Sequence, residues 1–239
     1  MSVNPAIDTG SDAAATVDGV IRARRTAKLM LSPESREQRA GQWSAEHLRA
    51  LETMVATAGF APFHKRASER SREGSDLQAV VPWRFTVVQG RACDGLLLWL
   101  EAQAEAQPDS MWTRAWRSKI KDMLAACGAL VQATWLPDRV EGAEEPVLST
   151  GNVEHIAAAS AAVQNLLLAA TARGWESYWS SGGILREPAV LERLGMDARE
   201  LPLGSIFLSP DVAHGATRID GGLRDERGEV EGWVRWVPA

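Results

Sequence analysis

The chain has 239 residues and a formal net charge of -5 at pH 7. A negative balance argues against general binding of nucleic acid or of a membrane surface, because both favour a basic protein. The length suits one large domain or two small ones, with enough residues to bury a sizeable core. These properties predict a cytoplasmic enzyme or binding protein.

The N-terminal region carries no signal peptide, because residues 1–15 have neither a basic start nor an apolar run. We expect these small, polar residues to form a disordered tail. Cys93 and Cys127 fit no disulfide or metal pattern and predict two buried thiols. The four histidines have no ligand spacing for zinc with cysteines or acids, so no metal site is predicted.

Periodicity, caps and turn residues predict the elements in chain order. The first part has a helix over Val17–Arg25, a loop over Leu31–Trp43, a helix between the cap Ser44 and Gly59, and a long polar segment over Ala61–Val81. The middle part has a strand over Trp83–Gln89, helices over Ala92–Ala106 and Ser110–Ala126, a strand over Leu130–Leu136, and a loop over Pro137–Gly151. The last part has a helix over Asn152–Ala172, a strand over Glu176–Ser180, a helix near Glu187–Leu194, a strand over Leu203–Leu208, and a candidate added strand at Trp233–Val237.

These elements mix helices and strands without a strict βαβ repeat, which predicts an α+β fold with about four antiparallel strands flanked by helices. We expect residues 16–239 to form a single domain. It contains an inserted loop at 66–81 and a C-terminal extension from about residue 211. The apolar window Ile156–Ala170 is short and interrupted by two polar residues, so it predicts a core helix and no membrane span.

A cationic cluster stands out near the N-terminus, where four basic residues occur within Arg22–Lys28. Like charges this close together repel, so the cluster either lies in water or faces an anion. Arg24, Arg25 and Lys28 offer charged donors, and Thr26 adds a hydroxyl, which together suit a phosphate. The alternative is a solvated basic turn at the end of the first helix.

Three segments taken together resemble the nitroreductase family of flavin enzymes, in particular its small YdjA-type members. The first is Arg24-Arg25-Thr26-Ala27-Lys28, similar to a turn that grips the FMN phosphate and ribityl chain. The second is Ala61-Pro62-Phe63-His64-Lys65, followed by Pro82-Trp83-Arg84-Phe85. The third is the Ala-rich helix containing Gln164-Asn165, followed by Trp179-Ser180-Ser181-Gly182.

The resemblance implies a nitroreductase-like fold and an FMN-dependent oxidoreductase that uses NAD(P)H in a ping-pong reaction with a small nitro, quinone or similar acceptor. It also implies a homodimer with FMN at the interface, in which a C-terminal segment is a candidate to complete the partner's sheet. The flavin carries the chemistry, so no catalytic side chain is predicted. The cofactor-binding residues implied are Arg24, Arg25, Thr26, Lys28, His64, Lys65, Trp179, Ser180, Ser181, Gly182, Gly183 and Arg218.

The chain also departs from the family pattern. Val81 replaces the glutamine that usually precedes Pro-Trp, and Gln78 is a candidate substitute. The loop over 66–81 is longer than usual, and we expect it to be mobile and to border the acceptor side of the flavin. Two alternatives stay open: a specialised flavin enzyme of the same fold, acting in dehalogenation, flavin fragmentation or heterocycle dehydrogenation, and a flavin-binding or interaction protein without turnover.

Overall fold

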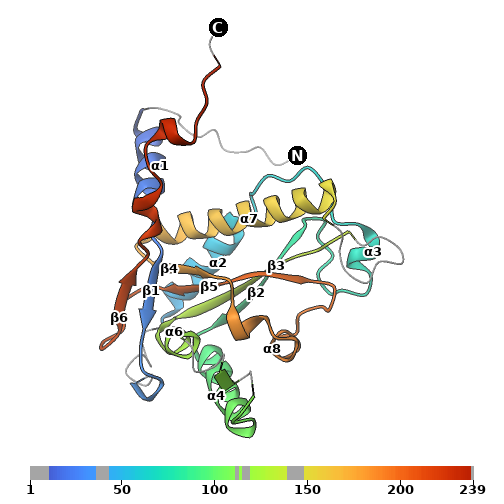
Figure 1. Ribbon diagram of the computed structural model, residues 1–239, viewed down its shortest axis with the longest axis vertical. Coiled ribbons are helices and arrows are strands. Elements are labelled where there is room, and N and C mark those ends of the chain that lie inside the picture. The colour runs from blue at the N-terminus through green and yellow to red at the C-terminus, as the bar shows by residue number, and fades with distance from the viewer. Residues whose placement is uncertain (1–10, 36–42, 111–112, 115–118, 139–147, 238–239) are drawn as a thin grey trace.

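The computed structural model describes residues 11–35, 43–110, 113–114, 119–138 and 148–237. Its centre is a four-stranded antiparallel sheet in the order β2-β3-β5-β4 (Figure 1). The strands are β2 (Trp83–Gln89), β3 (Ala129–Trp135), β4 (Glu176–Ser180) and β5 (Leu201–Ser209). The α+β prediction and its antiparallel four-stranded sheet are therefore confirmed.

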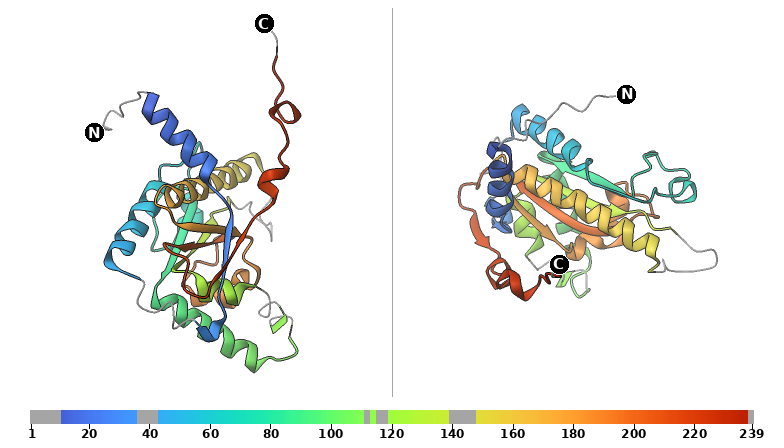
Figure 2. Two further views of the ribbon diagram at one scale, coloured as in Figure 1. Left: turned by 90° about the vertical axis from the view of Figure 1, so that its left-hand side faces the viewer. Right: turned by 90° about the horizontal axis from the view of Figure 1, so that it is seen from above.

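Helices cover both faces of this sheet. One face carries α2 (Ala45–Ala58) and α7 (Thr150–Thr171), and the other carries α4 (Arg91–Ala106), α6 (Ile120–Ala126) and α8 (Pro188–Arg193) (Figures 1 and 2). Strand β3 is buried along its whole length. Its side chains alternate between the layers: Val131 packs with the α2/α7 cluster, and Leu130 packs with the α4/α6 cluster.

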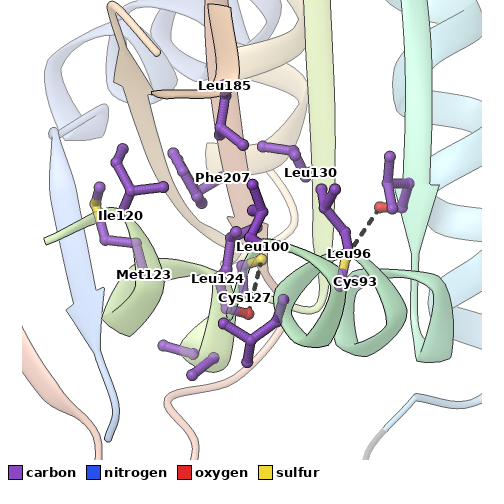
Figure 3. Close-up of a cluster of buried hydrophobic side chains, with 14 of the residues drawn as sticks. Cys93, Leu96, Leu100, Ile120, Met123, Leu124, Cys127, Leu130, Leu185 and Phe207 are labelled. Atoms are coloured by element: carbon purple, nitrogen blue, oxygen red, sulfur yellow. Dashed lines mark hydrogen bonds between the residues drawn. The ribbon is translucent and has the colours of Figure 1, made fainter. Parts of the chain in front are cut away.

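The α4/α6 cluster contains both cysteines (Figure 3). The Cys93 thiol donates to the Val88 carbonyl at 3.2 Å, and the Cys127 thiol donates to the Leu124 carbonyl at 3.5 Å. Both thiols are reduced and buried, as predicted. They fill space in the core beside Leu100 and Leu130 (Figure 3).

Helix α7 (Thr150–Thr171) forms close to the expected bounds Asn152–Ala172, with Ser149 and not Asn152 as its N-cap. It spans 22 residues, and it is the one helix among the described residues that is long and apolar enough to cross a membrane. Half of its most apolar window is nevertheless buried inside the protein, against β3, β5 and α2. Its packing is that of a core helix, which leaves an apolar strip on the outward side.

Two segments that lie far apart in the sequence form a second, two-stranded sheet. Strand β1 (Ala27–Met30) pairs antiparallel with β6 (Thr217–Asp220), with Lys28 opposite Ile219 and Leu29 opposite Arg218. We call this pair the terminal strap. Helix α1 (Ser11–Ala23) precedes it and the 3₁₀ turn η3 (Leu223–Glu226) follows it, so the two segments run side by side in Figures 1 and 2.

Several expectations need correction. Helix α1 begins at Ser11, so residues 11–15 are not a disordered tail, and residues 1–10 lie outside the described part. Lys28 lies in a strand and not in a turn. The helix expected over Ser110–Ala126 is described as helix α6 over its last seven residues, with residues 111–112 and 115–118 outside the description. Trp233–Val237 forms no strand within this chain and follows the 3₁₀ turn η4 (Val230–Gly232).

The structure predicts that Gly204 tolerates no side chain. A Cβ added there would lie 2.2 Å from Trp179 Nε1 and 2.6 Å from the Ser180 carbonyl oxygen. Gly204→Ala should therefore lower the free energy of unfolding by about 1–3 kcal/mol or more, because the backbone of β4 or the indole must move. Gly95→Ala is the control, since a Cβ there meets nothing within 4 Å and alanine favours the helix. Equal denaturation midpoints for the two variants would contradict the prediction.

Candidate functional site

The terminal strap neutralises part of the cationic cluster. Arg218 donates to Glu176 Oε1 at 2.9 Å and to Asp220, whose Oδ1 lies 2.7 Å away. Arg25 reaches the same Asp220 at 3.4 Å. These contacts raise the pKa of the Arg218 guanidinium, first through the hydrogen bond to Glu176. The anion that Arg25 and Arg218 face is therefore a carboxylate supplied by β6, which the local sequence does not indicate.

Arg24 and Thr26 remain available to a ligand. Arg24 is half-buried, and among the described residues its guanidinium forms no ion pair or side-chain hydrogen bond. Its carbonyl accepts from Arg224 Nη1 at 3.1 Å, and Arg224 also donates to the Arg22 carbonyl. A cation at the end of α1 satisfies carbonyl groups that the helix leaves unpaired, which fixes the backbone that presents Arg24.

Lys28 lines a cavity of about 550 Å³ next to β4. Its ammonium lies 4.9 Å from the centre of the Tyr178 ring, a cation–π contact that holds the side chain at the cavity wall. The cavity therefore brings together a strap residue and the loop after β4. The full lining is Lys28, Lys119, Ile120, Met123, Tyr178, Ser180, Ser181 and Gly183.

The loop after β4 has a backbone that only glycine accommodates well. Gly182 has φ 104° and Gly183 has φ 53°. A Cβ on Gly182 would lie 2.8 Å from Arg186 Cγ and 3.1 Å from Ser205 Oγ, so the chain also lacks room there. The Gly182 amide donates to Ser180 Oγ at 3.1 Å. This hydrogen bond closes the turn. Ser181 and Gly183, on either side of Gly182, line the cavity.

Trp179 faces the other way. Successive side chains of a strand point to opposite faces, so Tyr178 and Ser180 line the cavity and Trp179 packs with the α2/α7 cluster. Its indole lies close to Gly204 of β5. Of the residues implied by the resemblance, Trp179 therefore contributes a core contact on the far side of the sheet from this cavity.

His64 and Lys65 lie apart from the strap cavity. His64 lines a different hollow of about 220 Å³ on α7, with Pro62, Phe63, Glu154, Ala157, Ala158 and Ala161. The Lys65 ammonium lies at the first turn of α7, where a Cβ on Gly151 would be 3.3 Å away. The two hollows share no residue, so the predicted binding residues form two separate groups within one chain.

The inserted loop is an ordered structure built around Arg84. The buried Arg84 guanidinium donates to the carbonyls of Leu77, Ala79, Val81 and Trp83 at 2.7–2.9 Å. Arg72 of α3 (Glu69–Arg72) donates to the carbonyls of Ala67 and Gln78. The loop therefore has internal hydrogen-bonded anchors, which the sequence analysis did not find, and its mobility stays a prediction.

Gln78 is part of the same internal network. Its side-chain amide donates to the carbonyls of Arg72 and Ser75, so it is engaged within the loop. It is therefore not available as a substitute for the glutamine that Val81 replaces. The Ser71 hydroxyl adds a bond to the Pro137 carbonyl at 2.9 Å, which joins the loop to the end of β3.

Behind the loop, a buried carboxyl faces Arg84. Glu200 accepts from the Thr134 hydroxyl at 2.5 Å, and burial raises the pKa of this carboxyl while Arg84 opposes the change. Burial likewise lowers the pKa of Arg84, with Glu200 opposing it. The two groups offset part of each other's cost of leaving water, so Arg84 is held at the base of the loop.

We expect Arg84→Gln to loosen the inserted loop. The substitution removes the charged donor to four carbonyls, and each such bond contributes roughly 1.5–3 kcal/mol. Trypsin should cleave at Arg66, Arg70 and Arg72 at least about tenfold faster in this variant. The exposed Arg91→Gln is the matched control. Equal cleavage rates in both variants, with unchanged circular dichroism, would contradict the role of Arg84.

Sequence reasoning missed several residues at the strap cavity: Lys119, Ile120, Met123 and Tyr178. Tyr178 could have been predicted from the sequence, because it lies two positions before Ser180 and strand alternation places both on one face. Lys119, Ile120 and Met123 come from another helical layer, and no local pattern indicates that they reach β4.

Comparison with known proteins assigns the class. Residues 47–208, more than half of the chain, match the model of the nitroreductase family. The chain therefore belongs to the nitroreductase family, which confirms the resemblance and the nitroreductase-like fold expected from the sequence. No curated protein matches the chain.

Solved structures agree on the fold. A nitroreductase-like family protein from Bacillus cereus is 20% identical, with a TM-score of 0.54, covering 97% of this chain and 100% of that one. A nitroreductase with bound FMN from Bacteroides fragilis is 19% identical, with a TM-score of 0.55 and coverage of 93% and 98%. A nitroreductase with bound FMN from Desulfitobacterium hafniense is 16% identical, with a TM-score of 0.54 and the same coverage.

Proposed function

We propose that this chain is an FMN-dependent oxidoreductase that passes electrons from NAD(P)H to a small nitro, quinone or similar acceptor. The proposal rests on one observation: Lys28 of the terminal strap meets Ser180, Ser181 and Gly183 in a single cavity. Membership of the nitroreductase family and the FMN bound in two similar proteins support it. The cytoplasmic location stays a prediction.

The residues at the cavity suit FMN. A flavin needs cations for its phosphate, and it needs polar groups and an apolar wall around its flat ring. Lys28 of the lining is assigned to the phosphate end, together with Arg24 and Thr26, which precede it in the chain and are not part of the lining. Arg25 and Arg218 are paired charges that position the strap. The Ser181 and Gly183 backbone is assigned to the ring edge, and Ile120 and Met123 supply the apolar wall.

FMN supplies the redox step, since its N5 exchanges a hydride with nicotinamide and with an acceptor. The chain positions the reactants. Lys28, held over Tyr178, is a fixed positive charge that stabilises negative charge on a ligand bound in the cavity. Because donor and acceptor use one cavity in turn, the kinetics are proposed to be ping-pong.

Two alternatives are a specialised flavin enzyme of the same fold and a flavin-binding or interaction protein without turnover. Val81 and the internally bonded Gln78 leave the usual glutamine position without an amide, which favours the protein without turnover. Spectra separate the possibilities. A yellow protein bleached by NADPH is a reductase, and a yellow protein inert to nicotinamides is a specialised flavin enzyme or a flavin carrier. A colourless protein that cannot be reconstituted with FMN refutes the proposal.

Arg24→Ala should weaken FMN binding about ten- to a hundredfold, because it removes a charge-assisted hydrogen bond worth roughly 1.5–3 kcal/mol. Titration of the apoprotein, followed by flavin fluorescence, measures this affinity. Arg22→Ala is the control, since Arg22 is 82% exposed and contacts Asp18 at 3.8 Å. If Arg24→Ala binds FMN as tightly as Arg22→Ala does, the phosphate assignment is wrong.

We also propose a homodimer in which His64 and Lys65 serve the partner's cavity. The two hollows are separate in one chain, so a second copy is needed to bring both groups to one ligand. Helix α7 supplies an outward apolar strip with Val153 48% exposed, and Trp233 and Trp236 are 66% and 78% exposed. Apolar area of this kind is typical of obligate dimers.

Ala157→Glu should break this dimer, because it places a charge on the outward side of α7 beside His64. Ala189→Glu is the matched control, since Ala189 is exposed on α8, across the sheet from α7. Light scattering should give a dimer mass for the wild type and the control, and a monomer mass for Ala157→Glu. A monomeric wild type with tightly bound flavin would contradict the proposed assembly.

A further inference from the structure

The strap cavity carries more positive charge than the proposed cofactor assignment uses. Lys28 and Lys119 enter it from different elements, β1 and the residue preceding α6. The other lining side chains are apolar, aromatic or hydroxyl-bearing, and no lining residue is a carboxylate. With Lys28 assigned to FMN, the Lys119 ammonium has no ligand group assigned to it.

The acids near Lys119 do not neutralise it. Within the described residues Lys119 forms no ion pair. Burial is the largest cause of the raised pKa of Asp122 in α6. Lys121 lowers this pKa, and Glu34 raises it. Lys119 is therefore exposed, has no ion-pair partner in the described part of the chain, and lines a cavity that a second cation, Lys28, also lines.

An apolar wall lies directly beside this charge. Ile120 and Met123 are 5% and 4% exposed, and both line the cavity. A Cβ on Gly183 would touch Ile120 at 3.5 Å, so α6 lies against the loop after β4. A ligand that fits here has an apolar body against Ile120 and Met123 and an anionic group toward Lys119.

We propose that Lys119 is a specificity-determining residue that binds the anionic group of the ligand sharing the cavity with FMN. This inference rests on the proposed function. Two sources carry such a group: an acceptor with a sulfonate or carboxylate, and the phosphates of the nicotinamide dinucleotide. A compact ammonium at an exposed site attracts either one.

Binding of unreactive ligands to the flavin-loaded protein tests the proposal without turnover. Benzenesulfonate and benzenesulfonamide differ chiefly in charge, and oxidised NADP tests the dinucleotide phosphates. Calorimetry on wild type, Lys119→Gln and Lys121→Gln gives the dissociation constants. Lys121 is the control because it lies in α6, two residues after Lys119, and does not line the cavity.

Lys119→Gln should weaken benzenesulfonate or NADP about three- to tenfold, with benzenesulfonamide unchanged and Lys121→Gln like the wild type. Loss restricted to benzenesulfonate identifies the acceptor as the source, and loss restricted to NADP identifies the donor. Unchanged affinities for both anions overturn the proposal. So does loss of FMN in Lys119→Gln alone, which would assign the lysine to the cofactor. A wild type that binds no FMN refutes the proposed function itself.

Discussion

The buried amide of Gln132 ties the central sheet to the loop that borders the cavity. Gln132 lies in β3 and is fully buried, so both ends of its side chain need partners. Its Oε1 accepts from Ser205 Oγ at 2.6 Å, and its Nε2 donates to the Leu185 carbonyl at 3.3 Å. Leu185 belongs to the 3₁₀ turn η2 (Gly183–Arg186), and Ser205 lies against Gly182. The shape of the loop therefore depends on hydrogen bonds made inside the core.

Local patterns predicted the central sheet well, because each strand carries its own apolar run and ends at a turn residue. The strands Trp83–Gln89 and Glu176–Ser180 were predicted with the bounds that the structure has, and the capped helix after Ser44 forms α2. Nothing local predicts β1 and β6, since each is four residues long and the pairing joins residues 187–193 apart in sequence. The pairing of β1 with β6 brings Asp220 to the cationic cluster, so that Arg25 of this cluster faces a carboxylate of the same chain.

The inserted loop shows why a lack of apolar residues does not mean a lack of anchors. Its sequence offers few apolar anchors, which is the basis for predicting mobility. Its polar anchors come from Arg84, which lies after the loop, in the strand that the same reasoning predicted correctly. Predicting this contact requires knowing that the guanidinium points back toward its own preceding residues. The separation of His64 from the strap cavity could not be predicted either, because spacing in the sequence does not show which residues line the same cavity.

The terminal strap also sets an order of events during synthesis. Strand β1 leaves the ribosome well before its partner β6, which lies much further along the chain. At a typical 5–20 residues per second, the 195 residues between Arg25 and Asp220 take roughly 10–40 s. During that interval β1 has no strand partner, although the other residues that line the cavity are made before β6. A product truncated before β6 therefore contains every strand of the central sheet and every residue of the cavity lining, and lacks only the pairing that holds Lys28 in place.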